Sequence, residues 1–116
     1  MIHIQLKRAY EKPSMDDGIR ILVDRLWPRG VSKKAAAIDQ WCKEIAPSTE
    51  LRKWFAHDPD RWREFRRRYT AELREHAAEV QAIRDHARRG PITLVYAARD
   101  EVHNGAVVLR DVLIPK

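Results

Sequence analysis

The sequence Gly-Pro-Ile-Thr-Leu-Val-Tyr-Ala-Ala-Arg-Asp, residues 90–100, decides the fold class of this 116-residue chain. Gly90 and Pro91 are typical helix-ending residues, and the residues that follow are almost all apolar. A short apolar run without polar alternation predicts a strand buried on both faces, as in a parallel sheet. We place this strand at residues 92–98.

A long amphipathic helix is predicted before this strand. Asp58 is a suitable N-cap, and Pro59 fits the first helical position, where the N–H that proline lacks would be unpaired anyway. Apolar residues then recur at helical spacing up to Ala87. Roughly thirty residues is long for a helix in a globular protein, so we expect a kink or a break within it.

Further strands are predicted in the first half of the chain. Residues 2–8 alternate between apolar and polar side chains, which is typical of a half-buried strand. Residues 19–25 contain the apolar run of a more fully buried strand, and the polar residues 9–18 between the two form a loop. A third, weaker strand is predicted at residues 38–43.

Shorter helices complete the prediction. Ser32 can cap a helix that runs to Ala36, and Ser48 can cap one that runs to Phe55. A final helix is predicted to start near residues 100–103 and to continue to the C-terminus.

These elements predict an α/β fold: a single domain over residues 1–116, built as a sandwich with a small, mostly parallel sheet flanked by helices. A crossover between parallel strands usually takes about a dozen residues or more. The link between the first two strands is shorter, so that pair could be antiparallel.

Composition and charge limit the classes of protein to which this chain can belong. The chain has 23 lysines and arginines against 17 aspartates and glutamates, and its net charge of +6 attracts anions. It has no signal-peptide pattern and no apolar stretch near the ~20 residues of a membrane span, so we expect a cytoplasmic protein. Because Cys42 is the only cysteine and no histidine pair has metal-ligand spacing, we expect no disulfide, no metal site and no cofactor.

Charged side chains follow three of the predicted strands. In open α/β sheets, ligands usually bind beyond the carboxyl ends of the strands. If these strands run parallel, their ends meet, so we expect one site for a small anionic ligand that carries a phosphate or a carboxylate. The expected ligand-binding residues are Arg8, Arg25, Trp27, Arg29, Tyr96, Arg99 and Asn104.

The same region offers groups for acid–base chemistry. His103 can exchange a proton near neutral pH, and Asp24 or Asp100 can orient it, so these three are the candidate catalytic residues. Asn104 could donate a hydrogen bond to an oxyanion. The free N–H groups of residues 101–104 could add affinity for anions through the helix dipole.

Each of these residues also has a structural interpretation. Asp24 and Arg25 can form an ion pair at a strand end, and Asp100 can cap a helix. Trp27 can stack on a ligand or fill the core. His57 is most simply the residue that precedes a capped helix.

Two other functions remain open. The long helix carries the run Arg66-Arg67-Arg68, which would suit nucleic acid, but interspersed glutamates neutralise much of its charge, so we do not favour that alternative. The four tryptophans could instead form a protein-interaction surface. The sequence leaves open the oligomeric state and whether the chain is an enzyme.

Four segments resemble the YeaO-like family, a domain of unknown function (DUF488). They are residues 17–30, which include Asp-Arg-Leu-Trp-Pro-Arg-Gly, and residues 44–48, 51–59 and 94–104, so the resemblance covers essentially the whole chain. It implies a compact α/β domain of bacterial-type cytoplasm, and no particular substrate. Longer members of the wider superfamily carry a cysteine in the last strand and a Cys-His-Arg run after it. This chain has Tyr96 and Val-His-Asn there, so the resemblance implies no thiol chemistry.

Overall fold

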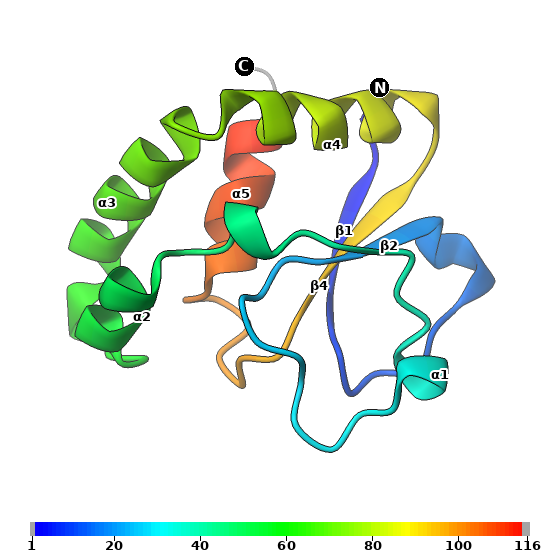
Figure 1. Ribbon diagram of the computed structural model, residues 1–116, viewed down its shortest axis with the longest axis horizontal. Helices are drawn as coiled ribbons and strands as arrows, with labels where there is room; N and C mark the ends of the chain where they lie inside the picture. Colours follow the sequence, from blue (N-terminus) through cyan, green and yellow to red (C-terminus); the bar gives the residue numbers. More distant parts are fainter. Residues whose placement is uncertain (1, 115–116) are drawn as a thin grey trace.

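The structure is a computed structural model that describes residues 2–114 (Figure 1). Its centre is a sheet with the strand order β1 (Ile4–Arg8), β4 (Ile92–Tyr96), β2 (Ile19–Leu22) and β3 (Gln40–Trp41). Each paired strand runs parallel to its neighbour. The predicted α/β fold with a small, mostly parallel sheet is therefore confirmed.

β4 is the buried centre of the sheet. All of its residues are buried, and Ile92 lies opposite both Ile4 of β1 and Ile19 of β2. The suggestion that the first two strands could be antiparallel is wrong, because they run parallel with β4 between them. Residues 9–18 can span ~33 Å, about twice the length of a five-residue strand, so they return the chain to the start of β2 without a helix.

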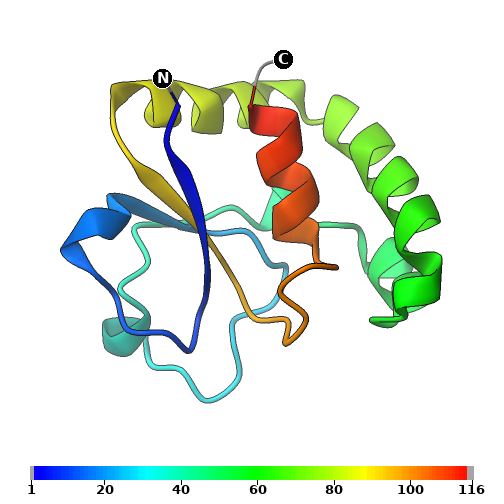
Figure 2. The ribbon, with the colours of Figure 1, turned by 180° about the vertical axis from the view of Figure 1, so that it is seen from behind.

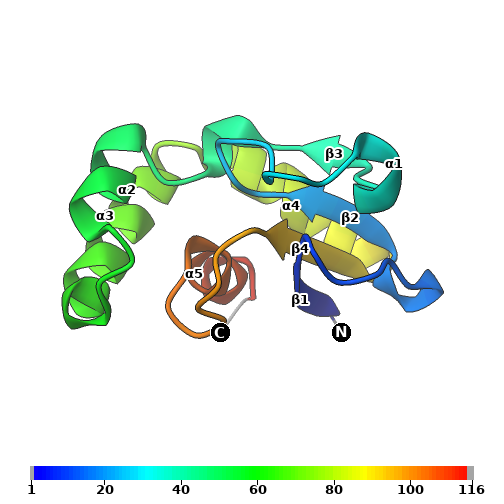
Figure 3. The same cartoon turned by 90° about the horizontal axis from the view of Figure 1, so that it is seen from below.

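Three helices lie on one side of the sheet (Figures 1 and 3), α2 (Thr49–Phe55), α3 (Trp62–Arg74) and α5 (Gly105–Leu113), and α4 (Ala77–Arg89) crosses the end of the sheet at which β1 and β4 begin. The main apolar core lies between these helices and the strands. Its buried residues include Ile21, Phe65, Tyr69, Leu73, Ile83, Leu94 and Leu109. This core gives the helices their common orientation toward the sheet, because each buries its apolar side there.

The predicted long helix is broken into three parts. Asp58 and Pro59 begin only a single 3-10 turn, η3 (Pro59–Arg61), in which the Asp58 side chain accepts a hydrogen bond from the N–H of Asp60. α3 follows, and the chain bends at Glu75 and His76 before α4 starts. The bend lets α4 lie across one end of the molecule, next to the start of β1 and the end of α5 (Figure 2).

Irregular segments cover the opposite face of the sheet. They are the loop after β1, which contains the 3-10 turn η1 (Met15–Asp17), and the segment around the short helix α1 (Lys33–Ala36). Asp17 is buried there and accepts hydrogen bonds from Arg20 Nη1 at 2.6 Å and from Lys7 Nζ at 2.9 Å. We refer to Lys7, Asp17 and Arg20 as the ionic cluster.

Gly18 joins the ionic cluster to β2. Its φ of +63° lies in the left-handed region, and a Cβ added at this position would stand 1.9 Å from the carbonyl oxygen of Pro91. Only glycine fits this close approach between the end of η1 and the start of β4.

Several boundaries differ from the prediction, although the caps agree with it. Ser32 caps α1 and Ser48 caps α2, as predicted. β3 has only two residues, and α5 begins at Gly105 instead of residues 100–103. The helix starts later because the Asp100 side chain binds the N–H groups of the residues that follow it and holds them in a turn. Within residues 2–114, no helix is both long and apolar enough to cross a membrane.

Candidate functional site

The carboxyl ends of β1, β2 and β4 open into a cavity of roughly 640 Å³. After β4 the chain turns to α5 on the helix-covered face, whereas after β2 it turns toward α1 on the opposite face (Figure 3). Neighbouring strands whose connections leave to opposite faces create a crevice between their ends, which is the usual ligand position in such sheets. The cavity volume is in the range of pockets that hold small molecules.

Nine of the ten predicted site residues line this cavity. They are Asp24, Arg25, Trp27, Arg29, Tyr96, Arg99, Asp100, His103 and Asn104. Arg8 is the exception, because its guanidinium points to the main chain and donates to the carbonyl oxygens of Ala98 at 2.9 Å and Ala97 at 3.3 Å. Arg8 therefore holds the segment after β4 in place and does not face the cavity.

Asp24 links the ends of β2 and β4. Its Oδ2 accepts a hydrogen bond of 2.8 Å from the N–H of Ala97. Burial raises the pKa of this carboxyl group, and the backbone hydrogen bond and the nearby positive charges of Arg52 and His57 oppose the rise only in part. The anticipated ion pair with Arg25 does not form, since the two side chains turn to different partners.

Arg25 is bound to one wall of the cavity. Its Nε donates to the carbonyl oxygen of Pro47 at 3.3 Å, and its Nη2 donates to that of Ala46 at 3.2 Å. The guanidinium group of Arg25, which was expected to hold a ligand anion, is therefore largely occupied by hydrogen bonds to main-chain carbonyl groups. We call residues 45–48 the cavity wall.

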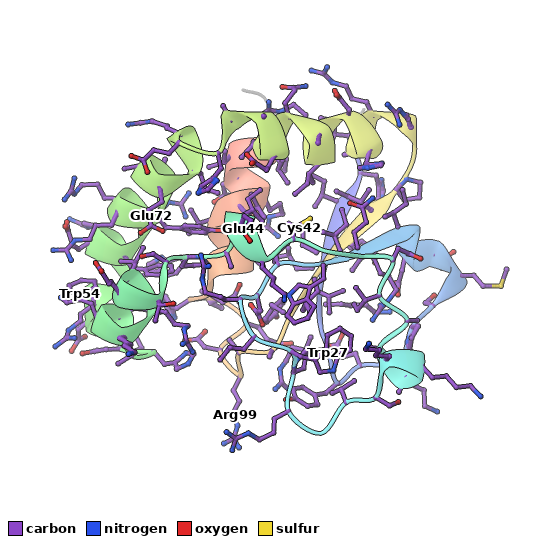
Figure 4. All side chains as sticks on the ribbon, in the orientation of Figure 1. Trp27, Cys42, Glu44, Trp54, Glu72 and Arg99 are labelled. Atoms are coloured by element: carbon purple, nitrogen blue, oxygen red, sulfur yellow. The ribbon has the colours of Figure 1, made fainter. Side chains whose placement is uncertain are left out.

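α3 fixes the cavity wall from its other side. The hydroxyl group of Tyr69 donates to the carbonyl oxygen of Ile45 at 2.7 Å. The carboxylate of Glu72, labelled on α3 in Figure 4, accepts hydrogen bonds from the N–H and the hydroxyl group of Ser48 at 2.8 and 2.6 Å. Together with Arg25, these bonds give the wall one position, so this side of the cavity is formed before any ligand arrives.

Asp100 and His103 form a hydrogen-bonded pair at the start of the segment that leads into α5. Asp100 Oδ1 accepts from the N–H groups of Val102 and His103 at 2.9 Å, and its Oδ2 lies 2.9 Å from His103 Nδ1. These donors lower the pKa of Asp100, so the carboxylate stays ionised. An ionised Asp100 requires the proton on Nδ1 and leaves Nε2 of a neutral His103 ring as an acceptor. Two of the four N–H groups that were expected to bind an anion, those of Val102 and His103, are thus already paired.

Asn104 has a structural role that the sequence did not reveal. Its Oδ1 caps α5 by accepting from the N–H of Val107 at 3.1 Å, and its Nδ2 donates to the carbonyl oxygen of Asp100 at 2.8 Å. The predicted oxyanion donor is therefore committed to the fold, although the residue borders the cavity.

The aromatic residues predicted for the site are mostly packed. The indole N–H of Trp27 donates to the carbonyl oxygen of Val31 at 2.7 Å, and its ring meets that of Trp41 edge-on at 5.4 Å. Trp27 also packs against Leu22 and Val95, so it fills the core instead of offering a free face. Tyr96 is buried, and burial, followed by the charge of nearby glutamates, raises the pKa of its hydroxyl group.

Three arginines at the cavity remain uncommitted. The guanidinium groups of Arg29, Arg52 and Arg99 are exposed and form no hydrogen bond or ion pair within residues 2–114. Figure 4 shows Arg99 projecting from the same end of the molecule as Trp27. Neither Asp24 nor Asp100 forms an ion pair with these arginines within residues 2–114, although the charge of Arg52 is near enough to act on the pKa of Asp24.

The sequence interpretation missed several lining residues, most of which come from outside the strand ends. Arg52 and Phe55 belong to α2, Tyr10 follows β1, and His57 follows α2. Ala56 and His57 both have positive φ, +48° and +57°, and the His57 side chain borders the cavity after this turn. The only sequence signal was a histidine before the cap of the next helix. Within residues 2–114, no group of three histidine, cysteine, aspartate or glutamate side chains could hold a metal ion.

Comparison with protein families gives a match over nearly the whole chain. A family model described as "Inactive DUF488-N3 subclade" matches residues 3–116. No solved structure matches the chain.

Relatives of similar length are found in bacteria. "Uncharacterized protein YeaO" of Escherichia coli (strain K12) is 48% identical over 110 residues, which cover 95% of this chain and 96% of the relative. "Uncharacterized protein Rv3073c" of Mycobacterium tuberculosis (strain ATCC 25618 / H37Rv) is 42% identical over 110 residues, which cover 95% of this chain and 92% of the relative.

Proposed function

The chain belongs to the YeaO-like DUF488 family, and we propose that it binds a small molecule carrying a phosphate or a carboxylate group in the cavity at the carboxyl ends of β1, β2 and β4. The observation that carries this proposal is the set of three uncommitted arginines, Arg29, Arg52 and Arg99, around one cavity. Arginine offers a planar fork of donors that matches both anions.

The balance of charge in the cavity favours an anion over a cation. Asp24 is turned to the N–H of Ala97, and Asp100 is enclosed by two backbone N–H groups and His103. Both carboxylates are therefore partly neutralised by their own surroundings. A ligand that enters the cavity meets positive side chains that form no hydrogen bond or ion pair with the described part of the chain.

Binding is the main proposal, and acid–base catalysis is the second. The description of the matching family model as an inactive subclade favours binding without turnover. The 2.9 Å contact between His103 and Asp100 favours acid–base chemistry, because an oriented imidazole is the usual proton-transfer group near neutral pH. Asp24 is the other candidate acid, since its carboxyl group borders the cavity and has a raised pKa.

A thermal-shift titration tests binding. Inorganic phosphate, nucleoside monophosphates and small carboxylates are added to the wild type, and a ligand that binds only the native state raises its melting temperature. Replacing Arg29 and Arg99 with alanine should weaken binding about tenfold or more, because hydrogen bonds to charged groups contribute about 1.5–3 kcal/mol each.

Arg88 supplies the matched control for these variants. It is exposed on α4, away from the cavity, and its guanidinium has no hydrogen-bond partner within residues 2–114. Arg88→Ala changes the net charge as each cavity variant does and should leave binding intact. Equal loss in Arg88→Ala and Arg99→Ala would mean that anions bind through overall charge and not at the cavity.

Turnover is tested separately with phosphate and carboxylate esters. A rate that disappears in His103→Gln, with binding retained, would support the catalytic part of the proposal. A rate that is the same in wild type and His103→Gln would exclude this histidine from the chemistry.

Nucleic-acid binding and a tryptophan-based protein interface are weaker alternatives. Glu64 contacts both Arg67 and Arg68 at 2.7 Å, and Arg66 pairs with Asp111 at 2.6 Å, so these two carboxylates offset part of the charge of the five arginines on α3. The ring of Trp54 is covered by the Arg68 guanidinium, 4.3 Å from its centroid. Binding of DNA or RNA that falls steeply with salt would favour the first alternative over the cavity proposal.

A further inference from the structure

Tyr10 is an exposed aromatic residue whose ring is nevertheless fixed. It retains 49% of its accessible surface and lies at the mouth of the cavity. Its hydroxyl group donates to the carbonyl oxygen of Arg29 at 3.1 Å. The guanidinium carbon of Arg8 lies over its ring, 4.9 Å from the centroid. The ring is thus held at its tip by a hydrogen bond and on one face by a cation.

The support under Tyr10 is part of the sheet. Arg8 is the last residue of β1, and its two bonds to the carbonyl oxygens of Ala97 and Ala98 join it to the segment after β4. Arg8 was expected to bind ligand directly. In its observed position it fixes the ring of Tyr10 beside the cavity instead.

Folding alone gives little reason to order this ring. An exposed aromatic side chain gains little from the hydrophobic effect, and fixing it reduces its rotamer freedom. A ring that is already fixed can stack on a planar group at low entropic cost, which is why rigid tyrosines are frequent in binding sites. Met15, another exposed apolar residue of the same loop, has no comparable contact within the described part of the chain.

The other aromatic rings at the cavity are committed elsewhere. Phe55 and Phe65 stack on each other with their centroids 4.3 Å apart, and both are buried. Trp27 packs edge-on against Trp41. Tyr10 is therefore the lining aromatic residue with a large exposed surface.

From this arrangement we infer that Tyr10 is a stacking platform, and that the ligand is a planar aromatic or heteroaromatic ring joined to a phosphate or carboxylate group. This inference rests on the proposed function, and it specifies the part of the ligand that the arginines do not contact. The hydroxyl bond to the main chain of Arg29 sets the platform next to one of the uncommitted arginines. One ligand can then place its ring on Tyr10 and its anionic group at Arg29.

Two pairs of matched probes isolate the contribution that a planar ring in the ligand makes to binding by the wild-type protein. Adenosine 5′-monophosphate and ribose 5-phosphate share the phosphate and differ in the base. Phenylacetate and cyclohexylacetate share the carboxylate and differ in planarity. We expect the planar member of at least one pair to bind about tenfold or more tightly by calorimetry, since stacking of one base on an aromatic side chain typically contributes that much.

Variants of Tyr10 then test whether the preference for a planar probe depends on the Tyr10 ring. Tyr10→Leu removes the ring and should abolish the preference for the planar probe. Tyr10→Phe keeps the ring and should retain most of the preference. Because Tyr10 is half exposed, both variants are expected to fold, and equal melting temperatures without ligand would confirm it.

The outcomes separate the two proposals. If planar and non-planar probes bind wild type equally, or if Tyr10→Leu keeps the preference, the stacking inference is overturned and anion binding stands. If neither the probes nor inorganic phosphate bind the wild type, the proposed function itself is wrong, and the stacking inference is overturned with it.

Discussion

Two aspartates lie at opposite ends of β2, in surroundings of opposite character. Asp17, at the amino end, is buried and contacts the side-chain nitrogens of Arg20 and Lys7 at 2.6 and 2.9 Å. Asp24, at the carboxyl end, has a carboxylate whose one hydrogen-bond donor within residues 2–114 is the N–H of Ala97. Burial acts to raise the pKa of both groups, but hydrogen bonds from Ser14, Lys7 and Arg20 outweigh it at Asp17, whereas burial prevails at Asp24.

The difference indicates what each end of the sheet contributes. At the amino end, opposite charges satisfy one another inside the protein, and they fasten an irregular segment onto the face that lacks long helices. At the carboxyl end, cations are left exposed beside a cavity. Charges at the amino end therefore serve stability, and the free charges at the carboxyl end are available for a ligand.

The largest expected effect comes from neutralising the ionic cluster. Asp17→Asn leaves Arg20 buried without its counter-charge, so the free energy of unfolding should fall by about 3–5 kcal/mol in urea denaturation. Asp16→Asn, an exposed neighbour in the same 3-10 turn, should change it by less than about 0.5 kcal/mol. Similar losses in the two variants would contradict a special role for the cluster.

Acid should reproduce this loss in the wild type. The pKa of Asp17 is lowered from 3.8 in the folded state, so its stabilisation is complete above the unfolded pKa and is lost as the pH falls through the folded pKa. The urea midpoint of the wild type should therefore drop below about pH 4, and that of Asp17→Asn should drop less.

A smaller effect is expected at the cavity wall. Tyr69→Phe removes the 2.7 Å hydrogen bond to Ile45 and leaves a buried carbonyl oxygen unpaired, which should cost about 1–2 kcal/mol of stability. Tyr10→Phe removes an exposed hydroxyl bond and should cost less than about 0.5 kcal/mol. Denaturation curves of the two phenylalanine variants, measured side by side, would show whether the wall is held as tightly as its bonds suggest.

Asp24→Asn should have the opposite sign to Asp17→Asn. Because the folded pKa of Asp24 is raised, its ionised form lowers stability at neutral pH, and the amide should raise the free energy of unfolding at pH 7 by up to about 1 kcal/mol. The asparagine side chain can still accept from the N–H of Ala97. The gap between variant and wild type should narrow as the pH falls through the folded pKa of Asp24 and close below about pH 3, where the aspartate is neutral in both states. A loss of stability at pH 7 would show that the charge of Asp24 is needed by the fold.

The smallest effect on stability is expected at the free arginines. Arg99→Ala breaks no hydrogen bond within residues 2–114, so its free energy of unfolding should stay within about 0.5 kcal/mol of the wild type. Arg25→Ala, which frees two carbonyl groups of the cavity wall, should cost more. If Arg99→Ala were as destabilising as Arg25→Ala, the distinction between structural and free arginines at the cavity would be lost.

The sequence was sufficient to predict that side chains from several strand ends would border one cavity. Parallel strands bring their carboxyl ends together whatever their order, so Asp24, Arg29, Arg99 and His103 could be expected near one another before the order was known. The alternation of apolar and polar residues and the caps at Ser32 and Ser48 were equally local signals. Such features depend on residues that are neighbours in the sequence, so they can be predicted without knowledge of the tertiary structure.

The sequence was not sufficient to predict which of these groups would be free. Arg8 and Arg25 bind main-chain groups 90 and 21 residues away in the sequence, and no local pattern marks those partners. Asn104 binds groups only three and four residues away, but its role as a cap was missed because the helix was expected to start earlier. Arg52 reaches the cavity because α2 packs over it, which depends on how the helices share the core. The parallel arrangement of β1 and β2 was missed because their spacing seemed too short, whereas an extended loop spans it easily.

The position of β4 has a consequence for how the chain acquires its structure. This inner strand is encoded last among the four, so β1 has no partner strand, and β2 only the two-residue β3, until residues 92–96 have been synthesised. Both must wait through most of translation with exposed strand edges, a state that favours aggregation and recognition by chaperones. The sheet therefore closes by long-range pairing in a late step, and a ribosome stalled before residue 92 would carry helices but no completed sheet.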